Sequence, residues 1–202
     1  MKILKRIILL IVVTLILVVI INYPKLNIIS GFSAKSTSSS VFLANRTLTF
    51  TDSTDNNFSP INIASDKLNF NESYATASTL GLLTRKAIYR EGLGSVLITK
   101  DFDVNKKQLV PKRRVSNNTI AYPYGNAPQK DTVISNVNYD KLNAIVSSIF
   151  KKEDETRAVL VIYKDQIIAE KYGTGFSSDS RILGWSMTKS ILSTVYGIMQ
   201  YQ

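Results

Sequence analysis

A serine and a lysine stand three residues apart in the segment GWSMTKSILS, residues 184–193. If this segment is helical, the side chains of Ser186 and Lys189 project to the same side, about one turn apart. A neutral lysine amine beside a serine hydroxyl can accept the hydroxyl proton, and the oxygen can then attack the carbonyl carbon of an amide or ester. The pair therefore predicts a nucleophilic serine, Ser186, with Lys189 as its base.

The composition excludes the commoner ways of activating a nucleophile. The chain of 202 residues contains no histidine and no cysteine, so it holds no Ser-His-Asp triad, thiolate nucleophile or disulfide. A helix start also offers unsatisfied backbone N–H groups for a developing oxyanion, and its positive dipole end disfavours a protonated lysine. Desolvation by the apolar neighbours Trp185, Met187 and Ile191 would favour the neutral amine further.

The same spacing also has a structural interpretation. Serine is a frequent N-cap, so Ser186 can cap the helix while Lys189 faces solvent. A second pair with this spacing, Ser148 and Lys151, falls on a predicted amphipathic surface helix and needs no chemistry to explain it. The spacing alone leaves both interpretations open, although a lysine in the first turn is opposed by the helix dipole.

The elements around Ser186 are predicted in the order helix, strand, strand, loop, helix. Apolar residues recur at helical spacing after Asn138 or Asp140, either of which can cap the helix. Residues 158–163 and 167–172 predict a hairpin with its turn at 164–166, and the first strand is apolar on both faces, so we expect it to be covered. The last helix carries an apolar stripe that predicts a buried face, formed by Met187, Ile191, Leu192, Val195, Ile198 and Met199.

The segment RAVLVIYKDQIIAEKYGTGFSSDSRILGWSMTKSIL, residues 157–192, resembles the start of the catalytic domain of β-lactamase-related serine hydrolases. This superfamily includes class C β-lactamases, D-Ala-D-Ala peptidases, esterases and 6-aminohexanoate-dimer hydrolases. Residues 30–47 and 81–98 also resemble amino-terminal extensions found in one of its branches. The resemblance implies that Ser186 is acylated with help from Lys189, and that the Ser186 N–H and an N–H of a later strand form the oxyanion hole.

The chain departs from the pattern of that superfamily after the predicted helix that carries Ser186 and Lys189. A Tyr-x-Asn-like element, whose tyrosine shares the base role, and a closing Lys-Thr-Gly or His-x-Gly strand do not follow before Gln202. The helix that carries the serine normally lies beneath a five-stranded sheet, of which only two strands are present. We therefore expect an incomplete, truncated hydrolase domain over residues 138–202 that turns over an amide or ester substrate poorly or not at all.

Residues 1–24 predict a transmembrane signal anchor. Basic residues precede an uncharged, mostly aliphatic run from 7 to 24, which spans about 27 Å as a helix and matches the hydrocarbon thickness of a bilayer. A cleaved signal peptide is the alternative, but the weak cleavage pattern ending at Ala34 lies far from the apolar run. Basic residues before the run place the amino terminus in the cytoplasm and the remaining chain on the extracytoplasmic side.

The middle of the chain divides into a strand-rich extension, residues 25–104, and an extended linker, residues 105–137. Residues 27–58 predict irregular coil with one or two strands, and residues 67–99 a small antiparallel sheet. The formal net charge is +10, and residues 105–115 are the most basic segment. With few aromatic neighbours, that segment predicts a solvated basic loop and no nucleic-acid partner.

The sequence predicts an α+β chain with a transmembrane helix, a strand-rich region and the first helix-hairpin-helix part of a β-lactamase-like (DD-peptidase) fold. It predicts no cofactor and no metal; Asp52 and Asp55 resemble a calcium loop only faintly and are expected in a solvated loop. The function is predicted as a membrane-anchored serine hydrolase acting on a small amide or ester. The alternative is a non-catalytic module that binds envelope material or a partner chain; the substrate and the oligomeric state stay open.

Overall fold

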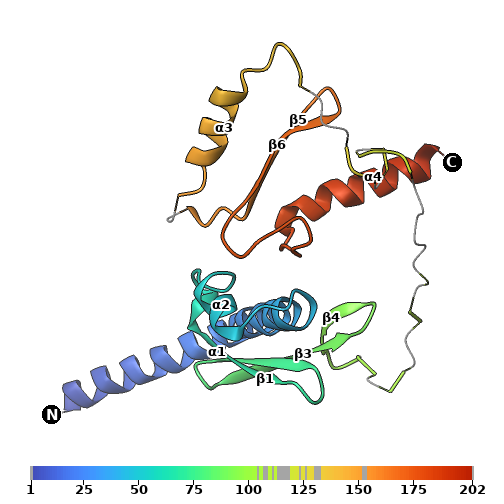
Figure 1. Ribbon diagram of the computed structural model, residues 1–202. Helices are drawn as coiled ribbons and strands as arrows, with labels where there is room; N and C mark the ends of the chain where they lie inside the picture. Colours follow the sequence, from blue (N-terminus) through green and yellow to red (C-terminus); the bar gives the residue numbers. More distant parts are fainter. Residues whose placement is uncertain are drawn as a thin grey trace. The chain divides into compact units, whose positions relative to one another are not determined.

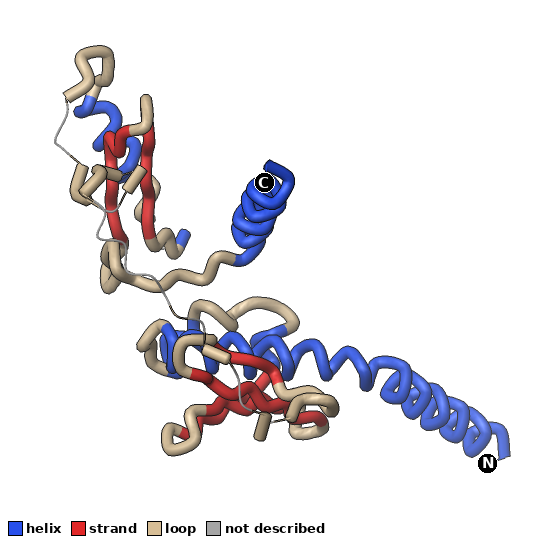
Figure 2. Tube along the Cα trace, turned by 90° about the vertical axis from the view of Figure 1, so that its right-hand side faces the viewer, coloured by secondary structure: helices blue, strands red, loops and turns tan. Residues whose placement is uncertain are grey.

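The protein is an α+β chain with antiparallel sheets, divided into two compact units, Met1–Lys112 and Arg113–Gln202. Figures 1 and 2 show each unit as its own arrangement of helices and strands. The computed structural model describes residues 2–103, 105–106, 109–110, 112, 119–122, 124–125, 127–129, 133–151 and 154–201. Most of the basic segment 105–115, and with it the prediction of a solvated loop there, lies outside these described residues.

A single long helix, α1 (Lys2–Ser38), begins the first unit. Its apolar amino-terminal part is long enough to cross a membrane and is not buried by the described residues. Figure 2 shows this part running beyond the sheet as a continuation of the same helix. The helix passes through Pro24 and does not end there, so the expectation that coil begins at residue 27 is wrong.

The carboxyl half of α1 is buried through small side chains. Ser30, Ser33, Ala34 and Thr37 are fully buried, and Ala34 packs with two alanines of the sheet. Small residues let the helix axis approach the sheet closely, because no large side chain separates the two backbones. The serine-rich composition that predicted coil therefore forms a packed helix face, in which the hydroxyls of Ser30, Ser33 and Ser38 bond to side chains of the sheet.

Short helical segments continue from α1 where the sequence predicted a strand. They are the π-helical turn η1 (Ser39–Leu43), the helix α2 (Leu48–Ser53) and the 3₁₀ turn η2 (Ile61–Ile63). Thr47 caps α2, and its side-chain oxygen accepts the Phe50 N–H at 3.1 Å. This local cap favours helix over the β propensity of the segment.

An antiparallel four-stranded sheet covers one side of α1, in the order β1-β2-β3-β4. Its strands are β1 (Ala64–Asn69), β2 (Tyr74–Thr79), β3 (Leu83–Arg90) and β4 (Gly94–Leu97). The antiparallel sheet predicted for residues 67–99 is confirmed. Ala75, Ala77 and Ala87 are fully buried on one face of it, and this alternation of side chains places the alanines opposite α1.

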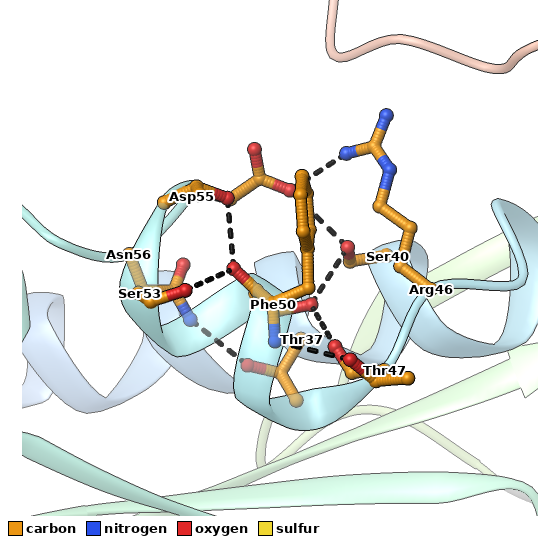
Figure 3. Close-up of polar contacts among 10 residues, drawn as sticks. Thr37, Ser40, Arg46, Thr47, Phe50, Ser53, Asp55 and Asn56 are labelled. Atoms are coloured by element: carbon orange, nitrogen blue, oxygen red, sulfur yellow. Dashed lines mark hydrogen bonds and ion pairs between the residues drawn. The ribbon is translucent and has the colours of Figure 1, made fainter. Parts of the chain in front are cut away.

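A buried polar cluster joins α2 to η1 and α1 (Figure 3). The Arg46 guanidinium and the Asp55 carboxylate form an ion pair of 2.7 Å, with side chains 10% and 1% exposed. Ser40 Oγ donates to the same carboxylate at 3.2 Å, and the Asn56 amide donates to Thr37 Oγ1 at 2.9 Å. The prediction of a solvated loop is therefore wrong for Asp55, whose charge is neutralised inside the fold.

The second unit contains α3 (Tyr139–Ser148), the hairpin of β5 (Ala158–Tyr163) and β6 (Gln166–Tyr172), the 3₁₀ turn η4 (Trp185–Met187) and α4 (Thr188–Tyr201). The predicted order of helix, strand, strand, loop and helix is present. Asn138 caps α3 by accepting the Lys141 N–H at 2.9 Å. Lys164 and Asp165 both have positive φ, as a two-residue hairpin turn of type I′ requires.

Part of the predicted linker packs along the hairpin. The Gln129 side chain accepts the Ile167 N–H at 2.7 Å and donates to the Ile167 carbonyl at 3.0 Å. The Tyr124 hydroxyl donates to Asp165 at 2.7 Å in the turn. Gln129 thus bonds to the edge of β6 as a neighbouring strand would, so this part of residues 105–137 is attached to the second unit.

Candidate active site

The loop from β6 to Ser186 is held at its start by a close backbone contact. The Gly173 N–H donates to the Arg157 carbonyl at 2.9 Å, and a Cβ atom on Gly173 would lie 2.6 Å from the Thr156 carbonyl oxygen. Only glycine fits this position without a backbone shift. Further along, the Ser177 N–H donates to Ser180 Oγ at 2.8 Å, and this bond stabilises a turn before the chain reaches η4.

The backbone immediately before Ser186 adopts an unusual conformation. Trp185 has φ +42°, in the left-handed region that residues other than glycine rarely adopt. The Met187 N–H donates to the Gly184 carbonyl at 2.8 Å, and Thr188 Oγ1 donates to the Trp185 carbonyl at 2.7 Å. Left-handed residues of this kind occur preferentially at functional sites, where surrounding contacts maintain them.

The side chains of Ser186 and Lys189 contact each other. Lys189 Nζ donates a hydrogen bond to Ser186 Oγ at 3.0 Å. Ser186 lies within η4 and does not cap it, because Gly184 is the N-cap residue and no side-chain cap bond forms there. Ser186 therefore does not cap η4, whereas Lys189 is exposed, as the structural interpretation expected.

The second Ser-x-x-Lys pair has a different geometry. Ser148 Oγ donates to the Ile145 carbonyl at 2.8 Å, within its own helix. Among the described contacts there is no hydrogen bond between Ser148 and Lys151. The same spacing thus brings the two side chains together at Ser186 and not at Ser148, which makes Ser148 and Lys151 a matched internal control.

The pair is open to solvent within the part of the chain that the structure describes. Ser186 and Lys189 are exposed, and so are Trp185 at 56% and Met187 at 66%. The apolar stripe of α4 is exposed along its length, and Leu160 and Ile162 of β5 are about half exposed. The predictions of a buried helix face and a covered strand are therefore wrong for the described residues, and the expected desolvation of Lys189 is not provided by them.

Two tyrosines of the second unit are held in their neutral form. A hydrogen bond to Glu170 raises the pKa of Tyr172, and a hydrogen bond to Asp165 raises the pKa of Tyr124. Both hydroxyls donate to a carboxylate. Neither tyrosine is therefore suited to accept the serine proton.

The sequence did not indicate a role for the carboxyl group of Asp66, and Asp52, which was expected in a solvated loop, lies in α2. Burial raises the pKa of Asp66, in β1, although hydrogen bonds from Ser33 and Thr37 oppose that shift. Ser33 Oγ donates to Asp66 Oδ2 at 2.6 Å. Burial and then repulsion from Asp66 raise the pKa of Asp52 to about 6. The serines spaced along α1 could have indicated a buried carboxylate such as Asp66, because hydroxyl groups buried on a helix face need hydrogen-bond acceptors.

The described residues contain no cluster of three or more His, Cys, Asp or Glu side chains that could hold a metal ion. Comparison with protein-family models found no match for the chain, and comparisons with curated proteins and with solved structures likewise found none.

Proposed function

We propose that the chain is a membrane-anchored serine hydrolase of the acyl-enzyme type, with Ser186 as the nucleophile and Lys189 as its base. The observation that carries the proposal is the 3.0 Å hydrogen bond from Lys189 Nζ to Ser186 Oγ. That distance lies within reach for direct proton transfer. The left-handed Trp185 next to the serine supports it, because such backbone strain is concentrated at functional sites.

The proposed reaction begins with the neutral amine of Lys189. This amine takes the Ser186 hydroxyl proton while Oγ bonds to the carbonyl carbon of an amide or ester. The tetrahedral intermediate then loses its amine or alcohol, which leaves with the proton returned by the Lys189 ammonium. An ester on Ser186 remains. Among the described residues, Lys189 is the one side chain that forms a hydrogen bond with Ser186 Oγ. No second side chain contacts this oxygen there to activate a water molecule, so we expect the acyl-enzyme to hydrolyse slowly.

The resemblance to β-lactamase-related hydrolases extends the proposal to the fold. In that fold the serine-bearing helix lies beneath a sheet that begins with a hairpin like β5–β6. The exposed apolar stripe of α4 and the half-exposed face of β5 are surfaces that such a sheet would cover. Covering them would also desolvate Lys189 and so favour the neutral amine that acts as the base.

The proposal places the chain on a membrane through α1. The uncharged run of this helix matches the bilayer thickness, and Lys2, Lys5 and Arg6 precede it. A basic flank before the first span favours a cytoplasmic amino terminus, so the sheet of the first unit and the second unit would lie on the extracytoplasmic side. The substrate would then be an amide or ester of the cell envelope or its surroundings.

Labelling of the full chain in detergent micelles with a fluorophosphonate probe tests the nucleophile. The expected result is one adduct, mapped by mass spectrometry to the peptide that contains Ser186. The adduct should disappear in Ser186→Ala and persist in Ser148→Ala, because only Ser186 bonds to its lysine. Absence of the adduct on folded protein, or equal labelling of Ser148, would overturn the proposal.

A non-catalytic module that binds envelope material or a partner chain is the second candidate. It is favoured by the exposure of Ser186, Lys189 and the apolar stripe of α4, because large exposed apolar patches mark interaction surfaces. A chain that folds but leaves Ser186 unlabelled would support this candidate over the hydrolase.

A further inference from the structure

We propose that the turn between β2 and β3, residues 80–82, lies in the membrane interface as a second membrane contact beside α1. This inference rests on the anchoring part of the proposed function, and it concerns the first unit alone. It identifies the partner of an exposed apolar turn as the lipid bilayer that α1 crosses.

Three contacts attach the turn to a defined level of α1. The Tyr23 hydroxyl donates to the Leu82 carbonyl at 3.3 Å. Ser30 Oγ donates to the Leu83 carbonyl at 2.8 Å and lies 2.6 Å from Thr79 Oγ1. Since Tyr23 precedes Ser30 on the helix, β2 and β3 approach the apolar end of α1 with their turn foremost.

The length of the apolar run places that level at the membrane boundary. The uncharged run extends from residue 7 to residue 24, which is about 27 Å of helix against a hydrocarbon layer of about 30 Å. Tyr23 and the exposed Lys25 therefore fall at the headgroup level, where tyrosine and lysine are typical anchors. The hydrogen bond to Leu82 brings the turn to the same level.

The side chains of the turn suit a lipid surface. Leu80 is 67% exposed and Leu82 57% exposed, on either side of Gly81. Leu80 also has φ +53°, at a turn position where glycine, asparagine or aspartate would normally be found. Exposure of the Leu80 side chain to water does not offset the strain of its backbone. Transfer of the same side chain from water to the acyl region of a bilayer is favourable.

The opposite end of the sheet behaves differently. The turn between β1 and β2 contains the polar, exposed residues Asn71 and Glu72. Its apolar residue, Phe70, is 67% exposed, and its ring contacts Phe42 with centroids 5.7 Å apart. The far turn therefore combines one exposed aromatic with polar and charged residues, whereas the turn beside Tyr23 consists of two exposed leucines and a glycine.

Site-directed spin labelling tests the inference on the full chain. Because the chain has no cysteine, Leu80→Cys and Leu82→Cys each give a single nitroxide in vesicles of phosphatidylcholine and phosphatidylglycerol. Collisions with oxygen, which partitions into lipid, are compared with collisions with a water-soluble nickel chelate. Ile16→Cys, within the apolar run, and Asn71→Cys, at the far turn, are the controls.

The expected result is that oxygen collisions dominate at positions 16, 80 and 82, while nickel collisions dominate at position 71. If position 16 is lipid-accessible but positions 80 and 82 match position 71, the turn is in water and the inference fails while the anchor stands. If position 16 itself is water-accessible, the anchor fails, and the inference that rests on it fails with it. These readouts are independent of acylation at Ser186.

Discussion

At the residue scale, identical spacing produces different chemistry because the backbone around each pair differs. Ser148 is the last residue of α3, and its hydroxyl donates to the carbonyl three residues earlier, so Lys151 lies beyond the end of the helix in which it was expected. Ser186 lies in a 3₁₀ turn after a left-handed residue, and its hydroxyl accepts from Lys189. The residue types and spacing of Ser186 and Lys189 were sufficient to identify the pair from the sequence. The sequence does not predict the left-handed Trp185, because tryptophan has no intrinsic preference for that region.

The Arg46–Asp55 pair stabilises the first unit through a buried charge contact. We expect Asp55→Ala to lower the free energy of unfolding by about 3–5 kcal/mol, because Arg46 is left charged and buried without its carboxylate. Thermal or urea unfolding in detergent micelles, followed by circular dichroism, measures this loss.

The matched control for that change is Glu72→Ala. Glu72 pairs with Lys86 at 3.9 Å, and the side chains are 67% and 41% exposed. An exposed pair of this kind contributes less than about 1 kcal/mol. If both variants lose similar stability, the Arg46–Asp55 pair does not have the structural role assigned to it.

At the element scale, the sheet was predictable and the path of α1 was not. Period-two alternation and turn residues such as the EGLG segment, 91–94, predict a small antiparallel sheet over residues 67–99. The continuation of α1 beyond Pro24 depends on tertiary packing, because its serines are favourable in a helix only when their hydroxyls find partners such as Asp66 and Thr79. Composition alone therefore predicted coil.

The packing of α1 on β1 also makes stability depend on pH. Burial raises the pKa of Asp66 above its usual range, so the folded state binds a proton more readily than the unfolded state. The associated stabilisation is complete below about pH 4, near the unfolded pKa, and is lost as pH rises through the folded pKa. Asp52 is exposed although its pKa is raised to about 6, so the prediction rests on Asp66.

We expect the thermal midpoint of the first unit to fall as the pH rises above about 4, and to fall less in Asp66→Asn. Asparagine resembles the protonated carboxyl group and does not titrate. Asp101→Asn, at an exposed position, should keep the wild-type pH dependence. A midpoint that rises over this range in the wild type, or an unchanged slope in Asp66→Asn, would contradict the role of Asp66.

At the scale of the whole molecule, α1 joins a membrane-length apolar helix to a folded unit without a break. In the proposed membrane topology, a continuous helix fixes the distance of the sheet from the bilayer by its rise per residue, since no linker intervenes. The apolar run and its basic flank were evident in the sequence. The attachment of the sheet to α1 was not, because it depends on contacts between residues far apart in the chain, such as Tyr23 and Leu82.

Two charges in the apolar run should remove the chain from the membrane. We expect the double variant Ile11→Lys, Leu15→Lys to be extracted by alkaline carbonate, because each lysine near the centre of a span costs about 2.5–3.5 kcal/mol. The wild type and Ile11→Ala, Leu15→Ala should stay in the membrane pellet. Extraction of the wild type would contradict anchoring by α1.

The base role of Lys189 is tested most directly by the rate at which Ser186 is acylated by a fluorophosphonate, followed by mass spectrometry of the peptide that contains it. Loss of a general base typically lowers the rate by about 10²–10⁴-fold. We expect a decrease in that range for Lys189→Met and an unchanged rate for Lys151→Met. Equal rates in wild type and Lys189→Met, with Ser186 still the labelled residue, would contradict the assignment of Lys189 as the base.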